Sequence, residues 1–238
     1  MGKAKKKNNK TKKRSAKDIK INTELYDKTI DSLQKLYADG RKAWTAPDEE
    51  KFEGIKTTAK GISASTYGEI TMKGVSTILA KFREEFQNPN AVFYDLGCGL
   101  GRMVGQIALL SDVKRSVGIE LCPNRIAAAR KLASTIEFPA AQPEFIEGNF
   151  LEQDYSDATI VYIDNTMYER DVTEKLLKML PPECIFIFQQ GWMPYGLPNF
   201  ECETTYNKTY DSSKEGQDRL FVYLAQRAAW QPAKGFKY

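Results

Sequence analysis

The 238-residue sequence contains no histidine and only four cysteines, none of them at C-x-x-C spacing. The cysteines are Cys98, Cys122, Cys184 and Cys202. Because zinc sites in proteins are built mainly from cysteine and histidine, we expect no metal site. Without an imidazole, any proton transfer must use another side chain or water. Thiols at these spacings fit a compartment that keeps them reduced, so we expect an intracellular protein.

Long apolar runs are also missing. No stretch is long enough to span a bilayer, and the first residues lack the composition of a secretory signal. The sequence begins with Met1 and Gly2, as myristoylated proteins do, but Lys6 stands where that motif requires Ser or Thr. We therefore expect no membrane partner and a nuclear or cytoplasmic location. The sequence does not predict an oligomeric state.

Positive charge is concentrated at the N-terminus. Residues 1–20 contain ten Lys or Arg and one acid, Asp18. The whole chain has 35 basic and 31 acidic residues, so the remainder has 25 basic and 30 acidic ones, a net charge of −5. The basic segment has almost nothing apolar to bury, which predicts a disordered tail. It is either a solubilising leader or an arm that binds nucleic acid, serves as a nuclear address, or does both.

Apolar runs and helical patterns alternate from residue 89 onward. Strands are expected at 91–96, 116–121, 143–147, 158–163 and 184–189, and helices at 102–111, 123–137 and 171–180. Such alternation is typical of a parallel sheet with helices on both faces. Segments near 200–207 and 219–225 have no helix between them and predict an antiparallel hairpin at the sheet edge. We expect an α/β protein with a doubly wound, mostly parallel seven-stranded sheet.

Two amphipathic patterns precede this sheet, over residues 23–39 and 72–87, and both predict helices. The chain is therefore divided into a basic tail, 1–20, a small helical N-terminal region, 21–88, and a main domain, 89–238.

Segment 95–101 reads Asp-Leu-Gly-Cys-Gly-Leu-Gly and lies between an expected strand and an expected helix. Glycines in a strand-to-helix turn let the backbone approach a ligand closely, with helix N–H groups pointing at it. Gly97, Gly99 and Gly101 give G-x-G-x-G rather than the G-x-G-x-x-G of nicotinamide-binding folds. Asp95 would repel a pyrophosphate, but it suits a ligand that carries positive charge, such as the amino group and sulfonium of S-adenosyl-L-methionine.

The ends of the next two expected strands supply further polar groups. Glu120 lies nineteen residues after Gly101, where an acid can accept hydrogen bonds from both ribose hydroxyls. Asn149 follows the third strand, and its side-chain oxygen can accept from an adenine amino group. Phe150 either stacks on the adenine or is an ordinary core aromatic.

The pattern Asp-x-Gly-x-Gly-x-Gly resembles motif I of class I methyltransferases, which have a Rossmann-like fold. Two further segments narrow the resemblance: Tyr67, Gly68 and Glu69 one helix upstream of motif I, and Asp164 to Tyr168 after the fourth strand. Together they resemble the Dot family (disruptor of telomeric silencing), the non-SET lysine methyltransferases that modify nucleosomal histone. The resemblance covers roughly residues 60–190. It implies S-adenosyl-L-methionine as cofactor and a basic protein, a histone or a similar one, as substrate.

The resemblance also assigns roles to residues. The Tyr-Gly-Glu segment at 67–69 is expected to close over the methionine end of the cofactor, with Glu69 either holding that end or only favouring a helix N-terminus. Tyr67 and Tyr168 are candidate walls of the lysine channel, in a segment where Asn165 is a further candidate catalytic residue. Asp164 either orients the lysine amine or accepts its proton, directly or through water, or it only binds the cofactor's amino group or caps a turn.

Other functions remain open at this point. Amino-methylating enzymes of nucleic acids often carry Asn/Asp-Pro-Pro-aromatic after strand four, and segment 164–167 here has no proline. A nucleic-acid methyltransferase is therefore the alternative enzyme, and a non-enzymatic scaffold whose tail recruits nucleic acid is the third hypothesis.

Overall fold

The computed structural model describes residues 68–138, 141–165, 168–188, 199–205 and 216–224. The expected basic tail, the helix expected over 23–39, and Tyr67 lie outside the described residues. Among the described helices, none combines the length and the apolar character that crossing a bilayer requires.

A single eight-stranded sheet forms the centre of the described structure, in the order β1-β7-β8-β6-β5-β2-β3-β4. Its strands are β1 (Glu69–Ile70), β2 (Val92–Leu96), β3 (Arg115–Glu120), β4 (Pro143–Glu147), β5 (Ile160–Ile163), β6 (Ile185–Phe188), β7 (Asn199–Thr205) and β8 (Gly216–Leu224). The five strands from β6 to β4 are parallel, and β7 and β8 form the expected antiparallel hairpin beside β6. The α/β architecture is confirmed.

The expected number of strands, seven, is wrong. The eighth strand is β1, which pairs antiparallel with β7 through Glu69 opposite Thr205 and Ile70 opposite Thr204. A two-residue strand is too short for any alternation of apolar and polar residues, so its sequence gives no periodic signal. Its pairing is decided by the return of β7, more than a hundred residues later in the chain.

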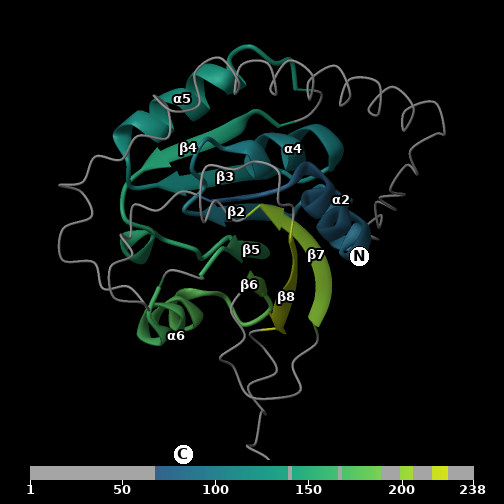
Figure 1. The fold of residues 1–238 in the computed structure, drawn as a ribbon, viewed down its shortest axis with the longest axis vertical. Helices are drawn as coiled ribbons and strands as arrows, with labels where there is room; N and C mark the ends of the chain where they lie inside the picture. Colours follow the sequence, from purple (N-terminus) through teal and green to yellow (C-terminus); the bar gives the residue numbers. More distant parts are fainter. Residues whose placement is uncertain (1–67, 139–140, 166–167, 189–198, 206–215, 225–238) are drawn as a thin grey trace, which may run out of the picture.

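Helices cover both faces of the sheet (Figure 1). They are α2 (Met72–Lys81), α3 (Arg83–Phe86), α4 (Arg102–Leu110), α5 (Pro123–Ala133) and α6 (Arg170–Met179), with a short 3-10 helix η2 (Phe150–Glu152). The helix expected over 72–87 is interrupted at Phe82, whose φ of −112° and ψ of 41° are not helical. Thr71 caps its start by accepting a hydrogen bond from the Gly74 N–H at 3.0 Å.

Side chains of the central strands alternate between two cores. In β2, Phe93 packs with α2 and α4 on one face, whereas Tyr94 and Leu96 pack on the other. The strands β5 and β6 alternate in the same way, and Leu176 of α6 belongs to the second core. Because both faces are buried, these strands read as continuous apolar runs. Parallel strands also bring their carboxyl ends to one edge, so the loops after β2, β3, β4 and β5 meet there.

Candidate functional site

The loop between β2 and α4 is shaped by three left-handed glycines. Gly97, Gly99 and Gly101 have φ values of 81°, 55° and 73°, a region that residues with a side chain rarely adopt. The N–H groups of Gly97 and Cys98 both donate to the Ile119 carbonyl, at 2.8 and 2.9 Å, and thereby attach the loop to β3. The glycine spacing therefore has a local cause, which is a backbone path that only glycine follows without strain.

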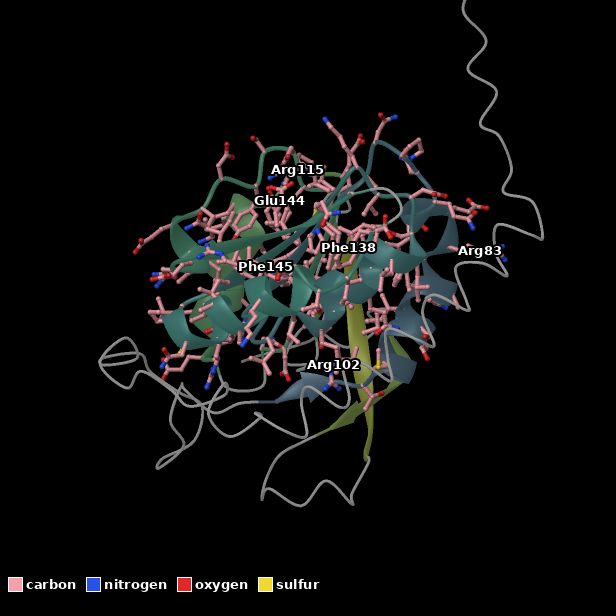
Figure 2. All side chains as sticks on the ribbon, turned by 90° about the horizontal axis from the view of Figure 1, so that it is seen from above. Arg83, Arg102, Arg115, Phe138, Glu144 and Phe145 are labelled. Atoms are coloured by element: carbon pink, nitrogen blue, oxygen red, sulfur yellow. The ribbon has the colours of Figure 1, made fainter. Side chains whose placement is uncertain are left out.

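Close packing beneath this loop requires glycine for a second reason. A Cβ on Gly101 would overlap the Phe145 ring of β4, and one on Gly118 of β3 would lie 2.6 Å from the Cys98 Sγ. Figure 2 labels Phe145 next to Glu144 on this strand. Burial raises the pKa of the Cys98 thiol well above its usual range, and the nearby Asp95 and Glu120 carboxylates add to the shift. The thiol is therefore a neutral packing group.

Glu120, at the carboxyl end of β3, is the most constrained polar side chain of the site. It is 4% exposed. Its Oε2 accepts from the Gly99 N–H and its Oε1 from the Cys122 N–H, both at 2.9 Å. The Arg125 Nη1 lies 4.0 Å from Oε1. One carboxylate thus joins the glycine loop, the turn after β3 and the first turn of α5.

Asp95 is the fourth of the five residues of β2 and is 5% exposed. The two acids approach the same glycine loop from neighbouring strands. Two buried acids next to a loop rich in backbone N–H groups favour a ligand that offers hydroxyl donors and positive charge. The structure brings together the predicted group of Asp95, Glu120 and the three glycines.

The loop after β4 adds Asn149 and Phe150. Asn149 Oδ1 accepts from the Leu151 N–H at 2.9 Å and caps η2, while its Nδ2 donates to Glu152 Oε1 at 3.1 Å. An amide oxygen has two lone pairs, so Asn149 can still accept one further hydrogen bond. The half-buried Phe150 ring meets the Tyr168 ring edge-on, with centroids 5.4 Å apart.

Tyr168 lies against the glycine loop. Its hydroxyl oxygen would be 3.6 Å from a Cβ placed on Gly97. Burial raises the pKa of the phenol, the carboxylates of Glu120 and Asp164 raise it further, and the Arg125 guanidinium opposes them. The phenol is therefore a neutral donor. Its contacts lie with Phe150 and Gly97, so Tyr168 belongs to the same group as the expected cofactor residues, and its expected role as a channel wall stays a prediction.

The two polar residues after β5 differ in their surroundings. Asp164 is half-buried, whereas Asn165 is fully buried and its Nδ2 donates to Thr173 Oγ1 of α6 at 3.3 Å. The Asn165 carbonyl also accepts from the Tyr168 N–H at 3.1 Å. Asn165 therefore fixes the segment that leads into α6, a structural role that the sequence pattern did not indicate.

The upstream segment is only partly described. Gly68 is exposed and Glu69 begins β1. By contrast, Arg125 was missed by the sequence reasoning. The position of Arg125 in the first turn of α5 is unusual, because a cation there is unfavourable unless an anion faces it. The sequence alone does not show that Glu120 is that anion.

The family model described as "Histone methylation protein DOT1" matches residues 53–183. A protein-lysine N-methyltransferase of Saccharolobus islandicus is 36% identical over 110 residues, which cover 43% of this chain and 66% of that protein. A histone-lysine N-methyltransferase, H3 lysine-79 specific, of Caenorhabditis elegans is 30% identical over 122 residues, or 46% of this chain and 13% of that protein.

Among solved structures, an RNA methyltransferase of Salinibacter ruber in complex with S-adenosyl-L-homocysteine has a TM-score of 0.43 and 23% identity. The match covers 64% of this chain and 90% of the Salinibacter ruber chain. The chain thus matches less than two thirds of the length of the two relatives compared by sequence.

Proposed function

The chain belongs to the DOT1 family of histone methylation proteins, and from this premise we propose that it is an S-adenosyl-L-methionine-dependent protein-lysine N-methyltransferase. The observation that carries the proposal is the buried pair Asp95 and Glu120 beside three left-handed glycines. The archaeal and nematode relatives, both named as lysine methyltransferases, support the same reaction.

The residues fit the proposed cofactor group by group. The three left-handed glycines carry no side chain, so they leave the loop backbone open to close approach by a ligand. Glu120 would accept from the ribose hydroxyls, and Asp95 would face the positive charge. Asn149 and Phe150 would hold the adenine. When bound, the cofactor supplies a methyl group on a sulfonium, so the protein has mainly to hold donor and acceptor in line.

The acceptor lysine must lose its proton, because its free pKa is about 10.4. An apolar channel that excludes water lowers a lysine pKa, since it disfavours the charged amine. Asp164, half-buried after β5, is the residue we assign to orient the amine or take its proton. Tyr67, Gly68 and Glu69 are proposed to close over the methionine end of the cofactor.

The proposed substrate is a histone or another basic, nucleic-acid-associated protein in the nucleus. The ten basic residues of segment 1–20 would bind phosphates and deliver the enzyme to such a substrate. Each phosphate contact releases counterions, so labelling of the substrate should fall steeply as salt is raised.

The test is methyl transfer from labelled cofactor to nucleosomes, free histones and RNA in separate reactions. We expect label on histone lysine, most from nucleosomes. A chain lacking residues 1–20 should label nucleosomes more weakly and bind S-adenosylhomocysteine with unchanged affinity in calorimetry. Label on RNA alone would make the protein a nucleic-acid methyltransferase and would contradict the proposed substrate.

Gly99→Arg is the negative control for the cofactor site. The loop at Gly99 has a φ of 55° and its N–H is bonded to Glu120, so a long side chain there should abolish S-adenosylhomocysteine binding. We expect a loss of affinity of at least about 100-fold, equivalent to about 2.8 kcal/mol. Unchanged affinity would show that the glycine loop is not the cofactor site.

A further inference from the structure

Arg125 is a buried guanidinium that neither the expected site nor the proposed reaction accounts for. It is the third residue of α5, and its side chain is 5% exposed, as is that of Glu120. The Arg125 Nη1 and the Glu120 Oε1 are 4.0 Å apart. Arginine is almost never buried to this degree unless it is paired, and Glu120 is a buried carboxylate within ion-pair distance of it.

The position of Arg125 in its helix strengthens this conclusion. The first turn of a helix carries partial positive charge from its free N–H groups, which disfavours a cation. Pro123 begins α5, and there is no acidic residue in its first turn. The helix dipole therefore disfavours a cation here, and the Glu120 carboxylate 4.0 Å away supplies an opposite charge.

The hydrogen bonds of Glu120 leave limited capacity for a ligand. Each carboxylate oxygen has two lone pairs, and one on each is taken by a backbone N–H, from Gly99 and from Cys122. One lone pair on each oxygen remains, which matches two neighbouring hydroxyls of a ribose. This match depends on the orientation of the carboxylate plane, which a third group can fix.

Arg125 also lies within electrostatic range of the rest of the pocket. Its charge acts on the Tyr168 phenol, in opposition to Glu120 and Asp164. Together with the 4.0 Å approach to Glu120, this places Arg125 on the buried side of α5, whereas Arg130 of the same helix is exposed and donates to the Phe145 carbonyl at 2.9 Å.

We propose that Arg125 is a positioning residue that holds the Glu120 carboxylate in the orientation that binds the ribose hydroxyls of an adenosyl cofactor. This inference rests on the proposed function and adds to it a residue that acts through Glu120. Arg125 touches no reacting atom, so its loss should raise the KM for S-adenosyl-L-methionine and leave kcat unchanged.

The test is a double-mutant cycle on the full chain, with S-adenosylhomocysteine affinity measured by calorimetry. Arg125→Met should weaken binding roughly tenfold, equivalent to about 1.4 kcal/mol. In a Glu120→Gln background the same substitution should cause no further loss. Arg130→Met is the matched control on the same helix, and it should keep wild-type affinity in both backgrounds.

Each outcome decides the proposal. Wild-type affinity in Arg125→Met, or an equal loss in both backgrounds, would overturn it. If Arg125→Met does not fold while the double variant does, the uncompensated carboxylate is the cause and the coupling to Glu120 is supported. If neither folds, Arg125 is needed for reasons independent of Glu120 and the proposal fails. A wild-type chain that does not bind S-adenosylhomocysteine at all would instead remove the proposed function on which the inference rests.

Discussion

Strands β3 and β4 have charged groups at both ends, and the two groups are built differently. At the amino end, the Arg115 guanidinium donates to Glu144 at 2.8 and 2.7 Å and to Asp157 at 2.6 Å, with side chains that are 30%, 43% and 45% exposed. Figure 2 shows Arg115 and Glu144 side by side. At the carboxyl end, the side chains of Glu120 and Arg125 are each 5% exposed.

The difference lies in what holds each carboxylate and in how much water reaches it. Glu144 and Asp157 are bonded by a flexible, solvated side chain, so water competes with the arginine. Glu120 is bonded by backbone N–H groups whose positions the fold fixes. A side chain held in this way loses little further conformational entropy when a ligand binds. The buried end of the strands is therefore suited to ligand binding, and the solvated end to attaching neighbouring strands to each other.

The largest effect on stability is expected from adding one methyl group to the glycine loop, at the carboxyl end of the strands. Gly101→Ala combines a left-handed φ of 73° with overlap of the Phe145 ring. We expect the free energy of unfolding to fall by about 3 kcal/mol, from backbone strain and overpacking together. Urea denaturation monitored by circular dichroism would measure this loss.

Gly105→Ala, one turn further into α4, is the control for that experiment. A Cβ on Gly105 meets nothing within 4 Å, and alanine is the better helix former. This variant should raise the free energy of unfolding by about 0.5–1 kcal/mol. Equal effects at the two glycines would mean that the loop is not tightly constrained.

A smaller effect is expected from removing the central charge at the amino end. Arg115→Met should lower the free energy of unfolding by about 1 kcal/mol at low salt, because its partners are solvated and screened. The loss should shrink in 1 M salt, and S-adenosylhomocysteine affinity should stay at the wild-type value. A change in that affinity would show that the two ends of the strands are coupled.

The smallest effect concerns Tyr94, whose hydroxyl donates to Asp157 Oδ1 at 2.8 Å. Tyr94→Phe should cost about 0.5 kcal/mol at neutral pH. Burial, followed by the hydrogen bond to Asp157, raises the pKa of Tyr94 from 10.0 to about 12. The stabilisation by the neutral phenol is therefore complete below pH 10 and is lost as the pH rises toward 12, because the unfolded chain ionises first.

Denaturation of Tyr94→Phe and the wild type at pH 8, 10 and 11.5 would measure that dependence. The stability advantage of the wild type should shrink as the pH rises and reverse in sign by pH 11.5, because the folded phenol resists ionisation while the unfolded one ionises. An advantage of the wild type that grows with pH would place the ionisation of Tyr94 below its usual value and contradict the hydrogen bond to Asp157.

Much of the fold could be predicted from local patterns. The five parallel strands lie within about two residues of their expected ends, and α2 begins at Met72, as expected. The strand β1 could not be predicted, because its pairing depends on β7, which is distant in sequence. The local pattern also did not indicate the helix break at Phe82. The hydrogen bond from the Asn165 side chain to Thr173 in α6 likewise depends on tertiary placement, and the expected catalytic role of Asn165 stays a prediction.

The sequence by itself determined the parallel α/β plan and the glycine loop with its two acids, because alternating apolar runs and glycine spacing are properties of short segments. Only the tertiary structure decided which charged side chains are buried and which groups each of them contacts. Glu120 meets the N–H of Gly99, and Arg125 turns toward Glu120, because strands β2 and β3 and helix α5 converge at one edge of the sheet. Burial is the sum of contacts from separate elements, and no single segment of the sequence contains it.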